Sequence, residues 1–324
     1  MQERFETFTV LINRISRDIR KIKNQEMADY HLRSAHVSCL YYVYSLGSVT
    51  SAELCEHCEE DKATISRAVD YLETSGFLLR GTSGFHEKGV HRNPQNVMRY
   101  AGRLWNTLEW GSWASGTHAT MVASIDENAD LLNAANWHFT PPVPYDPQWE
   151  GTAKGHSPGN IEGTLVITPR GELWNILRYQ IGGCDPSYGL ALVMQPDPEN
   201  PDAPETFVKT IRFPGNHSKF EITYDAQSGY YVSLVSYLCE SHPDGRNWLA
   251  LIASRDLEHW EKIEDVFDYR DAPAQEVGFQ YIAYLIEGDD ILLLSRTAFN
   301  QAANFHDANY SVFHRVRNFR RNLR

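Results

Sequence analysis

The sequence of 324 residues has few cysteines, no long apolar run and no excess of basic residues. Its five cysteines form an odd, sparse set, unlike the even, dense pattern of a disulfide-framed secreted domain. No apolar stretch approaches the roughly 20 residues of a membrane span. The first ten residues lack the basic-then-apolar order of a secretory signal. These features predict a cytoplasmic protein.

The formal net charge is −12 and is unevenly distributed. Residues 1–80 carry 10 basic and 12 acidic side chains, a net of −2, whereas the remainder carries 20 and 30, a net of −10. So acidic a remainder would be repelled by a phosphate backbone. Nucleic acid is therefore expected to bind, if at all, only to the first 80 residues.

Apolar residues near the N-terminus alternate spacings of three and four, which predicts one long helix with a heptad seam. The seam has two interpretations: it packs on its own domain, or residues 5–22 pair with a second copy in a homodimer. Farther along, Cys55 and Cys58 are three apart and lack a second pair, so no metal is expected there, and no cofactor is expected elsewhere. The seam residues are Phe5, Phe8, Ile12, Ile15, Ile19 and Ile22.

Two short helices joined by a tight turn are predicted next. After an apolar helix that ends at Gly47, "HVSCLYYVYSLG", Thr50 and Glu53 form a capping box. Asp61 can cap the following helix, "KATISRAVDYLETSG", and Gly76 is its expected stop. This is helix-turn-helix geometry. Four small polar or basic residues are left on the outer face of the second helix: Lys62, Thr64, Ser66 and Arg67.

The stretch from Phe8 to Leu78, and "EDKATISRAVDYLE" most specifically, resembles the MarR family of winged-helix regulators. The resemblance implies a dimer that binds DNA through residues 50–76 and inserts Lys62–Arg67 into the major groove. Lys62, Thr64, Ser66 and Arg67 would then contact phosphates and base edges. Where that family continues into a β-wing, this sequence has the short polar segment "RGTSG". The predicted division is a domain over 1–79, a linker over 80–84 and a second domain over 85–324.

The second domain repeats a pattern of about sixty residues. Its units read "NVMRYAGRLWNTLEW", "GTLVITPRGELWNILRY", "KFEITYDAQSGYYVSLVSY" and "QYIAYLIEGDDILLLSRT", each followed by a loop and a third strand. A trailing fourth strand follows the first three units. Antiparallel four-stranded units in series predict a β-propeller of about four visible units. The fold class is thus multidomain, a helix-turn-helix bundle followed by an all-β domain. The corresponding positions are Trp105, Trp174, Val232 and Leu292.

Polar side chains recur at equivalent positions of the units. In an up-and-down blade, the start of the first strand and the end of the second lie on the same face. Ionisable groups converging there suit a polar, possibly anionic, small ligand. The first-strand starts are Gln95 or Asn96, Glu162, Lys219 and Gln280, and the second-strand ends are Glu109, Arg178, Ser236 and Arg296.

Residues 84–319, with "NHSKFEITYD" and "LLLSRTAFNQAANFHDANYSVFHRVRNF", resemble sialidase-like propellers. The resemblance implies glycoside recognition, with arginines holding a substrate carboxylate and a Tyr/Glu pair or two carboxylates at the anomeric carbon. Glu162, Tyr281 and Asp307 become candidate catalytic residues, Glu162 as acid or base and Tyr281 as nucleophile. Such propellers generally have five or six blades, whereas four units fit here. The implied substrate-binding residues are Arg178 and Arg296 as anion clamps, with Glu109, Lys219, His306 and Gln280 in the pocket.

Three interpretations of the whole chain follow. In the first, a DNA-binding transcriptional regulator carries a carbohydrate-binding propeller. In the second, the propeller is a sialidase-like glycoside hydrolase and the helical part serves dimerisation. In the third, the chain is an incomplete fusion without function. The residues themselves leave open whether a bound sugar is cleaved.

Overall fold

The computed structural model describes residues 2–46, 49–75, 77, 90–92, 97–112, 117–154, 157–182 and 184–323. The chain divides into two compact units, residues 1–82 and 83–324. The predicted linker 80–84 lies outside the described residues, as do Gly47, Gly76, Gln95 and Asn96. Within the described part, no helix combines the length and apolar character that crossing a membrane requires.

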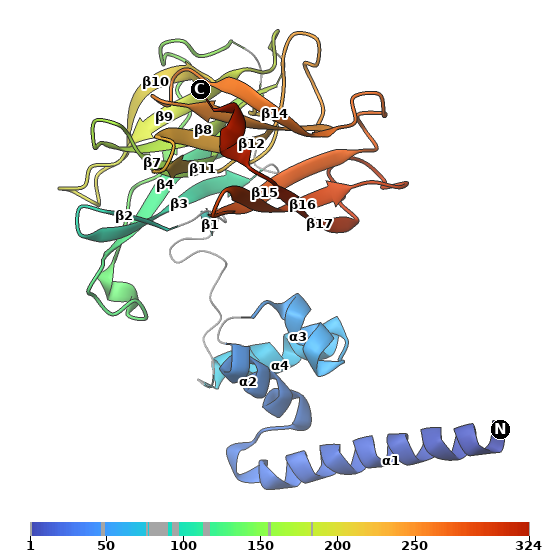
Figure 1. Cartoon of the computed structure of the whole chain (residues 1–324). Helices are drawn as coiled ribbons and strands as arrows, with labels where there is room; N and C mark the ends of the chain where they lie inside the picture. Colours follow the sequence, from blue (N-terminus) through green and yellow to red (C-terminus); the bar gives the residue numbers. More distant parts are fainter. Residues whose placement is uncertain are drawn as a thin grey trace. The chain divides into compact units, whose positions relative to one another are not determined.

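The first unit is helical (Figure 1). It contains α1 (Gln2–Glu26), η1 (Ala28–Tyr30), α2 (Ser34–Leu46), α3 (Ser51–Cys58) and α4 (Lys62–Thr74). The predicted capping box is present, because the Thr50 side chain accepts from the Glu53 amide and the Glu53 side chain accepts from the Thr50 amide. Asp61 caps α4 by accepting from the amides of Ala63 and Thr64. The two caps mark the starts of α3 and α4.

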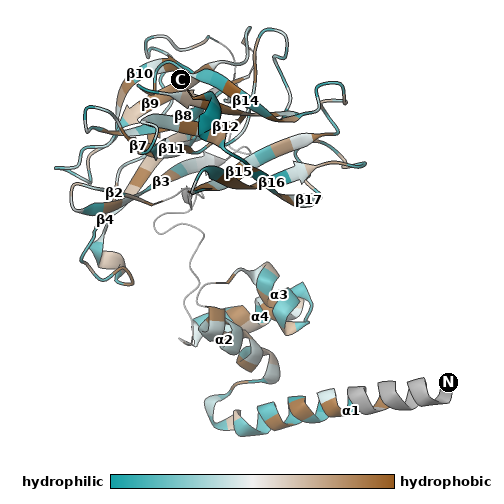
Figure 2. Ribbon diagram, in the orientation of Figure 1, coloured by the Kyte–Doolittle hydropathy of each residue, from teal (hydrophilic) through white to brown (hydrophobic). Residues whose placement is uncertain are grey.

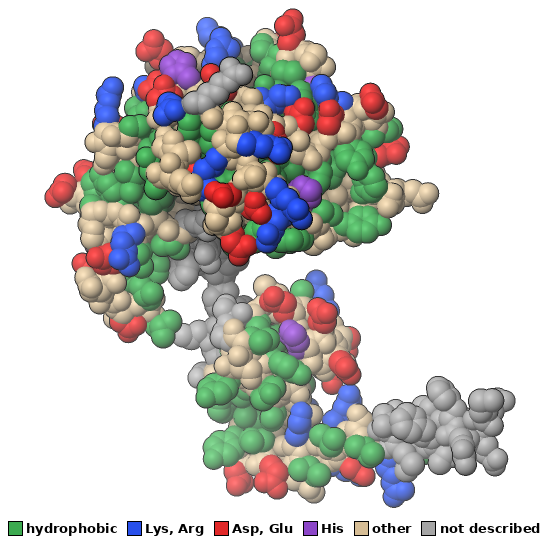
Figure 3. All heavy atoms as spheres, viewed as in Figure 1, with side chains coloured by type: hydrophobic (Ala, Val, Ile, Leu, Met, Phe, Trp, Pro, Cys, Tyr) green, Lys and Arg blue, Asp and Glu red, His purple; other side chains and the backbone are tan. Residues whose placement is uncertain are grey.

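One face of α4 forms the core of this unit. Ile65, Ala68, Val69 and Leu72 are buried, as the 3.6-residue periodicity predicts, and pack with α2 and α3. The seam of α1 is different: Ile15, Ile19 and Ile22 are 54%, 48% and 56% exposed. Figure 2 marks hydrophobic positions along α1 in brown, and Figure 3 shows apolar side chains on the surface of the helical unit. These three residues of the seam therefore do not pack in the core of their own unit, and the side chains of Phe5, Phe8 and Ile12 lie outside the described part.

The second unit consists of four antiparallel sheets among the described residues, arranged as a four-bladed propeller (Figure 1). The first sheet has β1 (Val90–Arg92), β2 (Met98–Tyr100), β3 (Arg103–Ser112), β4 (Thr117–Asp126), β5 (Trp137–Phe139) and β6 (Val143–Pro144). The second has β7 (Ser157–Ile167), β8 (Leu173–Gly182), β9 (Leu190–Gln195) and β10 (Thr206–Arg212). A short helix, η2 (Ala134–Asn136), precedes β5.

The third sheet has β11 (Ile222–Asp225), β12 (Tyr230–Ser236), β13 (Trp248–Ser254) and β14 (Glu261–Asp268). The fourth has β15 (Gly278–Glu287), β16 (Asp290–Ala298) and β17 (Tyr310–Val316), and η3 (Phe319–Asn322) ends the chain. Each predicted repeat is therefore one sheet. The prediction of uniform four-stranded units is wrong for two of the sheets. In the part that the structure describes, the first sheet has six strands and the last has three.

The turns between first and second strands lie together on one face of the propeller, here named the turn face. Tyr100, beside the first turn, donates its hydroxyl to the Gly171 carbonyl in the second at 2.8 Å. Arg320 joins the third turn to the fourth by donating to Asp225 and to the Gly288 carbonyl. The starts of the first strands consequently lie toward the opposite face, where the polar positions are predicted to converge.

A buried carboxyl joins the first two sheets. Glu205 is 3% exposed and accepts from the Thr120 hydroxyl on β4 at 2.7 Å and from the Asn175 amide on β8 at 2.8 Å. Both of its oxygens thus have donors, which reduces the cost of burying the carboxyl. Burial still raises the pKa of Glu205 from 4.5 to about 7.

Glu205→Gln is expected to remove one pH dependence of stability. Because the native state holds this proton more tightly than the unfolded state does, the free energy of unfolding falls as pH rises through about 4.5 to 7, by roughly 3 kcal/mol. Glutamine has no proton to lose, so the variant's profile should be flatter. Urea unfolding across this window measures the slope. The exposed Glu199→Gln variant should keep the wild-type profile, and an unchanged slope in Glu205→Gln would contradict the assignment.

Candidate functional site

Two residues in the first strands of the second and fourth sheets have unusual backbone conformations. The register of β7 against β8 shifts between Ile161 and Gly163, and Glu162 at this bulge has φ +48°. The register of β15 against β16 shifts after Gln280, where Tyr281 has φ +52°. A non-glycine residue in the left-handed region costs about 1–3 kcal/mol, so surrounding contacts must hold both in place. Bulges redirect side chains out of the strand alternation.

The two redirected side chains lie close enough to interact. The charge of the Glu162 carboxylate acts on the Tyr281 phenol. Burial raises the pKa of Tyr281 above its ordinary value, and the negative charge of Glu162 raises it further, while Arg178 and Arg246 act in the opposite direction. The phenol is thus protonated at neutral pH and has a carboxylate nearby.

Glu162 is held from two sides. Arg178 on β8 donates from Nη1 to Glu162 Oε2 at 2.7 Å, and the two side chains are 6% and 15% exposed. The Glu162 backbone amide donates to Glu109 Oε2 on β3 at 3.0 Å. A charge-assisted bond this short and this buried orients the carboxylate strongly.

Arg178 is also bonded to the segment that precedes β11. Its Nε donates to the Asn216 carbonyl at 3.0 Å and its Nη2 to the His217 carbonyl at 3.1 Å. The next residue, Ser218, accepts from the Tyr281 amide through its hydroxyl at 3.3 Å. One segment, residues 216–218, therefore lies against both the arginine that holds Glu162 and the backbone of Tyr281.

Two further arginines flank Tyr281. The guanidinium carbons of Arg246 and Arg296 lie 6.0 and 5.6 Å from the centre of the Tyr281 ring. Arg246 is 7% exposed and donates from Nη1 to Gln280 Oε1, but its Nε has no hydrogen-bond partner among the described residues. Burial, aided by repulsion from Arg178, lowers the pKa of Arg246 to about 10, so it remains a cation at neutral pH. The site thus contains a buried cation with an unused donor.

Lys219 contributes another buried amine. It is 4% exposed, and burial lowers its pKa, while the carboxylates of Glu221 and Glu162 oppose this effect. Electrostatic coupling to Glu162 places Lys219 in the same cluster.

Sequence-predicted residues from all four sheets are brought together here. The loop of residues 304–307 borders them, because the His306 carbonyl accepts from Arg296 Nη2 at 2.8 Å and from Gln280 Nε2 at 3.1 Å. The His306 and Asp307 side chains are 51% and 61% exposed, and Asp307 accepts from the Asn304 amide within the loop at 2.6 Å. The converging residues are Glu109, Glu162, Arg178, Lys219, Gln280, Tyr281 and Arg296.

Other positions turn out differently. Ser236 makes a contact between strands, because its hydroxyl donates to the Phe279 carbonyl at 3.0 Å. Sequence reasoning missed Arg246, His217 and Ser218. Arg246 lies two residues before β13, the third strand of its sheet, whereas the predicted positions are first-strand starts and second-strand ends. The polar stretch "DGRN" before an apolar strand was the available signal.

The residues predicted to contact DNA lie together at the start of α4. Lys62, Ser66 and Arg67 are exposed and Thr64 is half-buried. The Thr64 hydroxyl donates to Asp61 Oδ2 at 2.7 Å and accepts from Arg67 at 3.4 Å. Within the described residues, no group of three or more His, Cys, Asp or Glu side chains is arranged to hold a metal ion.

No protein-family model matches this sequence, and neither does any curated protein. Neither the MarR nor the sialidase resemblance therefore has support from a family comparison. Among solved structures, the protein is similar to a complex of BT0996 with RGII (14% identity, 71% of each chain, TM-score 0.44). It is also similar to a structure described as "Glycoside hydrolase" (14%, 72% of each chain, 0.43) and to the GH43 endo-arabinanase from Bacillus licheniformis (14%, 68% of this chain and 71% of that one, 0.35).

These structures are described as a complex with RGII, a glycoside hydrolase and an arabinanase, and none of the three is described as a sialidase. All three TM-scores lie below 0.5, and the site and its chemistry are therefore argued from the contacts of this chain alone.

Proposed function

We propose that the propeller unit is a glycoside hydrolase that acts on a sugar bearing a negative charge. The observation that carries this proposal is the electrostatic coupling of Tyr281 to Glu162, two residues in left-handed conformations with arginines beside them. A neutral phenol beside an oriented carboxylate is an activated nucleophile, because the carboxylate accepts the proton as the oxygen attacks. Sialidases use a tyrosine nucleophile of this kind.

The reaction then has two displacements. The Tyr281 oxygen bonds to the anomeric carbon, its proton passes to Glu162, and the bond to the leaving-group oxygen breaks, with solvent supplying the proton that this oxygen takes up. Water next attacks the anomeric carbon and loses its proton to solvent, while Glu162 returns the proton that it holds to the departing Tyr281 oxygen and so restores the phenol. Two inversions give net retention at the anomeric carbon. Arg178 has its donors on protein acceptors, so we assign it the role of positioning Glu162.

The charge of the substrate follows from the other two arginines. Arg246 is a buried cation whose Nε has no hydrogen-bond partner in the described part of the chain. The guanidinium of Arg296 lies near the Tyr281 ring, as that of Arg246 does. A carboxylate on the sugar would pair with both and relieve the cost of burying Arg246. The anion clamp is therefore proposed as Arg246 with Arg296, and Gln280 orients Arg246 by accepting a hydrogen bond from its Nη1.

Glu162→Gln and Tyr281→Phe are each expected to lower kcat/KM at least about 100-fold, because each removes the proton acceptor or the nucleophile. The measurement is release of the chromophore from a panel of 4-nitrophenyl glycosides that includes sialosides and uronides. Glu287→Gln and Tyr310→Phe make the same chemical changes at exposed positions of the fourth sheet and should leave turnover unchanged. Full activity in Glu162→Gln, or no turnover on the whole panel, would remove the proposal.

A second function is proposed for the helical unit, sequence-specific DNA binding as a dimer. The supporting observation is that Lys62, Ser66 and Arg67 are exposed side by side at the start of a capped α4. Arg67→Ala is expected to weaken binding to the protein's own upstream DNA about tenfold or more in a salt-dependent gel shift. Arg17→Ala, on α1, is the control. Equal binding by both variants would contradict this role.

The dimer itself is proposed to form through α1, whose Ile15, Ile19 and Ile22 are exposed at heptad spacing. Light scattering on the whole chain decides this point, since a monomeric mass would exclude it. A protein that neither turns over glycosides nor binds DNA would leave the third interpretation, an incomplete fusion.

A further inference from the structure

The fourth sheet ends on a strand that has no neighbouring strand on its outer side. Among the described residues this sheet consists of β15, β16 and β17, and β17 pairs with β16 alone. The second and third sheets each have a fourth strand at this place, β10 and β14. Backbone N–H and C=O groups on the outer side of β17 are therefore open to pairing with a further strand.

This edge has little of the protection that the other edge strands have. The register of β10 against β9 shifts between Phe207 and Lys209, and the register of β14 against β13 shifts twice. β17 pairs with β16 without a shift from Tyr310 to Val316. Its sequence, "YSVFHRV", has one permanently charged residue, Arg315, where β14, "EKIEDVFD", has five. Bulges and charges normally discourage edge strands from pairing, so β17 is well suited to accept another strand.

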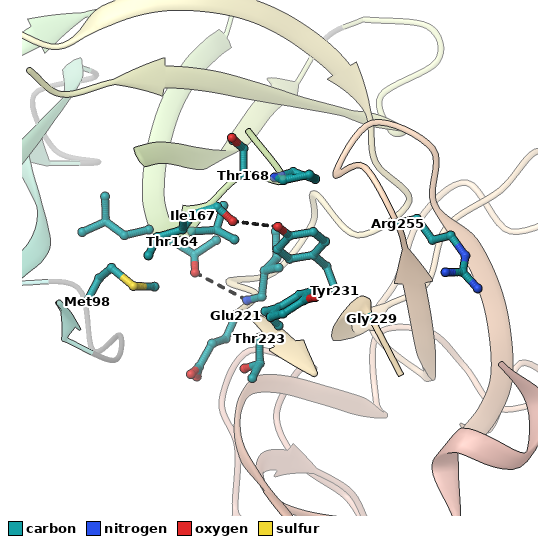
Figure 4. Close-up of a pocket in the computed structure, with 14 residues that line it drawn as sticks. Met98, Thr164, Ile167, Thr168, Glu221, Thr223, Gly229, Tyr231 and Arg255 are labelled. Atoms are coloured by element: carbon teal, nitrogen blue, oxygen red, sulfur yellow. Dashed lines mark hydrogen bonds between the residues drawn. The ribbon is translucent and has the colours of Figure 1, made fainter. Parts of the chain in front are cut away.

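The fourth sheet also has an exposed apolar strip beside this edge. The second and third sheets pack on each other, where Tyr231 on β12 donates to the Ile167 carbonyl of β7 (Figure 4), and β13 is buried along its whole length. In β16 burial alternates instead, so that Leu293 is 1% exposed and Leu294 is 53% exposed. The partner of Leu294 on β17 is Phe313, which is 62% exposed. Leu294 and Phe313 thus carry an apolar surface up to the free edge.

A second copy of β17 fits this edge. Phe313 is the middle residue of β17, so two copies related by a twofold axis overlap fully when Phe313 lies opposite the same residue of the second copy. The apolar strip then continues from Leu294 and Phe313 across the axis. Because the pairing is antiparallel, the outer groups of each strand meet their equivalents on the other.

The charges along this segment favour the same arrangement. Arg315 and Arg317 lie at its end, whereas Asp307 precedes its start with a side chain that is 61% exposed. Antiparallel pairing about Phe313 places Arg317 opposite Asn309 of the second copy and two residues from its Asp307. The two copies of Arg315 are then four residues apart along the strands, which is about 13 Å. Opposite charges approach each other and like charges stay apart.

We infer that β17 is a dimerisation strand, through which two copies of this chain join their fourth sheets edge to edge with Phe313 at the twofold axis. This interface is separate from the seam of α1, and it rests on neither of the functions proposed above. A pair of seven-residue strands buries less than the roughly 800 Å² per partner of a standard interface, so we expect a Kd of about 10–100 μM.

The first test is sedimentation equilibrium of the whole chain with Ile19→Asp, a substitution that disrupts the α1 seam. At about 0.5 mM this variant should be mostly dimeric. Adding Phe313→Lys should make it monomeric, because like charges would face each other across the axis. Leu285→Lys is the matched control: Leu285 is 56% exposed on the same face of the sheet but lies on β15, away from the free edge, so the dimer should persist.

Two results of this measurement would overturn the inference. One is a monomeric mass for the Ile19→Asp variant at this concentration. The other is loss of the dimer in Leu285→Lys as well as in Phe313→Lys, because that pattern would indicate packing of the two sheets face to face.

Cysteine substitution tests the register. Phe313→Cys should form a reducible covalent dimer when diamide is added as the oxidant, because opposed residues of antiparallel strands have Cα atoms about 4.5–5.5 Å apart, within reach of a disulfide. Ser311→Cys is exposed on the same strand and face but would lie about 13 Å from its counterpart, so it should cross-link no more than the wild type. Cross-linking of Phe313→Cys at only the wild-type level would contradict the pairing, and cross-linking of Ser311→Cys in its place would contradict the register.

Discussion

Arg178→Met is expected to destabilise the propeller unit by about 3–5 kcal/mol, because it leaves the buried Glu162 carboxylate without its cation. The pair is joined at 2.7 Å with 6% and 15% of the side chains exposed. The same substitution removes the donors to the Asn216 and His217 carbonyls. All eight tryptophans lie after residue 100, so urea unfolding followed by tryptophan fluorescence reports on this unit alone.

A double substitution separates the lost charge pair from lost packing. Arg178→Met combined with Glu162→Gln should be more stable than Arg178→Met alone, since no uncompensated charge then remains buried. If Arg178→Met lowered the free energy of unfolding by less than about 1 kcal/mol, the pair would be one of the weak ion pairs typical of exposed surfaces.

Arg320→Met is expected to lower the free energy of unfolding by a similar amount, about 3–5 kcal/mol. Arg320 donates from Nε and Nη2 to the two oxygens of Asp225 at 2.7 and 2.8 Å, and from Nη1 to the Gly288 carbonyl at 2.8 Å and to Asp289 at 3.0 Å. Arg320 and Asp225 are 15% and 5% exposed. One side chain near the end of the chain thus joins the third and fourth sheets at the turn face.

The neighbouring arginine is the matched control. Arg321 is 59% exposed and contacts Glu264 at 3.2 Å, so Arg321→Met should change stability by less than about 1 kcal/mol. The hydrogen bonds from Arg320 lower the pKa of Asp225 below 3.8. The contribution of this pair is therefore present above pH 3.8 and is lost as pH falls through the lowered value. Equal losses of unfolding free energy in Arg320→Met and Arg321→Met would contradict the role of Arg320 in joining the two sheets.

Local patterns are enough to predict the sheets. Each first strand is joined to its second by a short turn, and Gly171 and Gly229 have φ +82° and +73° in two of these turns, where glycine meets no Cβ penalty. Turn and strand signals depend on residues that are close in sequence. They can therefore be recognised in each copy of the repeat of about sixty residues. Caps are local in the same sense, which is why Thr50 and Asp61 are predicted correctly.

The conformations at the site could not be predicted in this way. Glu162 and Tyr281 have left-handed backbones without being glycine, and contacts from other sheets hold them there: Arg178 and Glu109 for the first, Ser218 for the second. The predicted anion clamp at Arg178 illustrates the same limit. Its position at the end of a second strand is correct, but its donors point to residues 38 and 39 positions away in sequence.

The amino-acid sequence by itself determined the two-part organisation, the capped helices, the four sheets and the recurrence of polar residues at equivalent strand positions, because hydrophobic periodicity, caps and turns act over a few residues. Only the tertiary structure decided which of those polar residues touch. It placed Glu162 near Tyr281 and bonded Arg178 to the carbonyls of residues 216 and 217. It also placed Arg246 near the Tyr281 ring and left Ile15, Ile19 and Ile22 of α1 exposed. Side chains far apart in sequence meet according to bulges and sheet packing, which depend on contacts among all of the sheets at once.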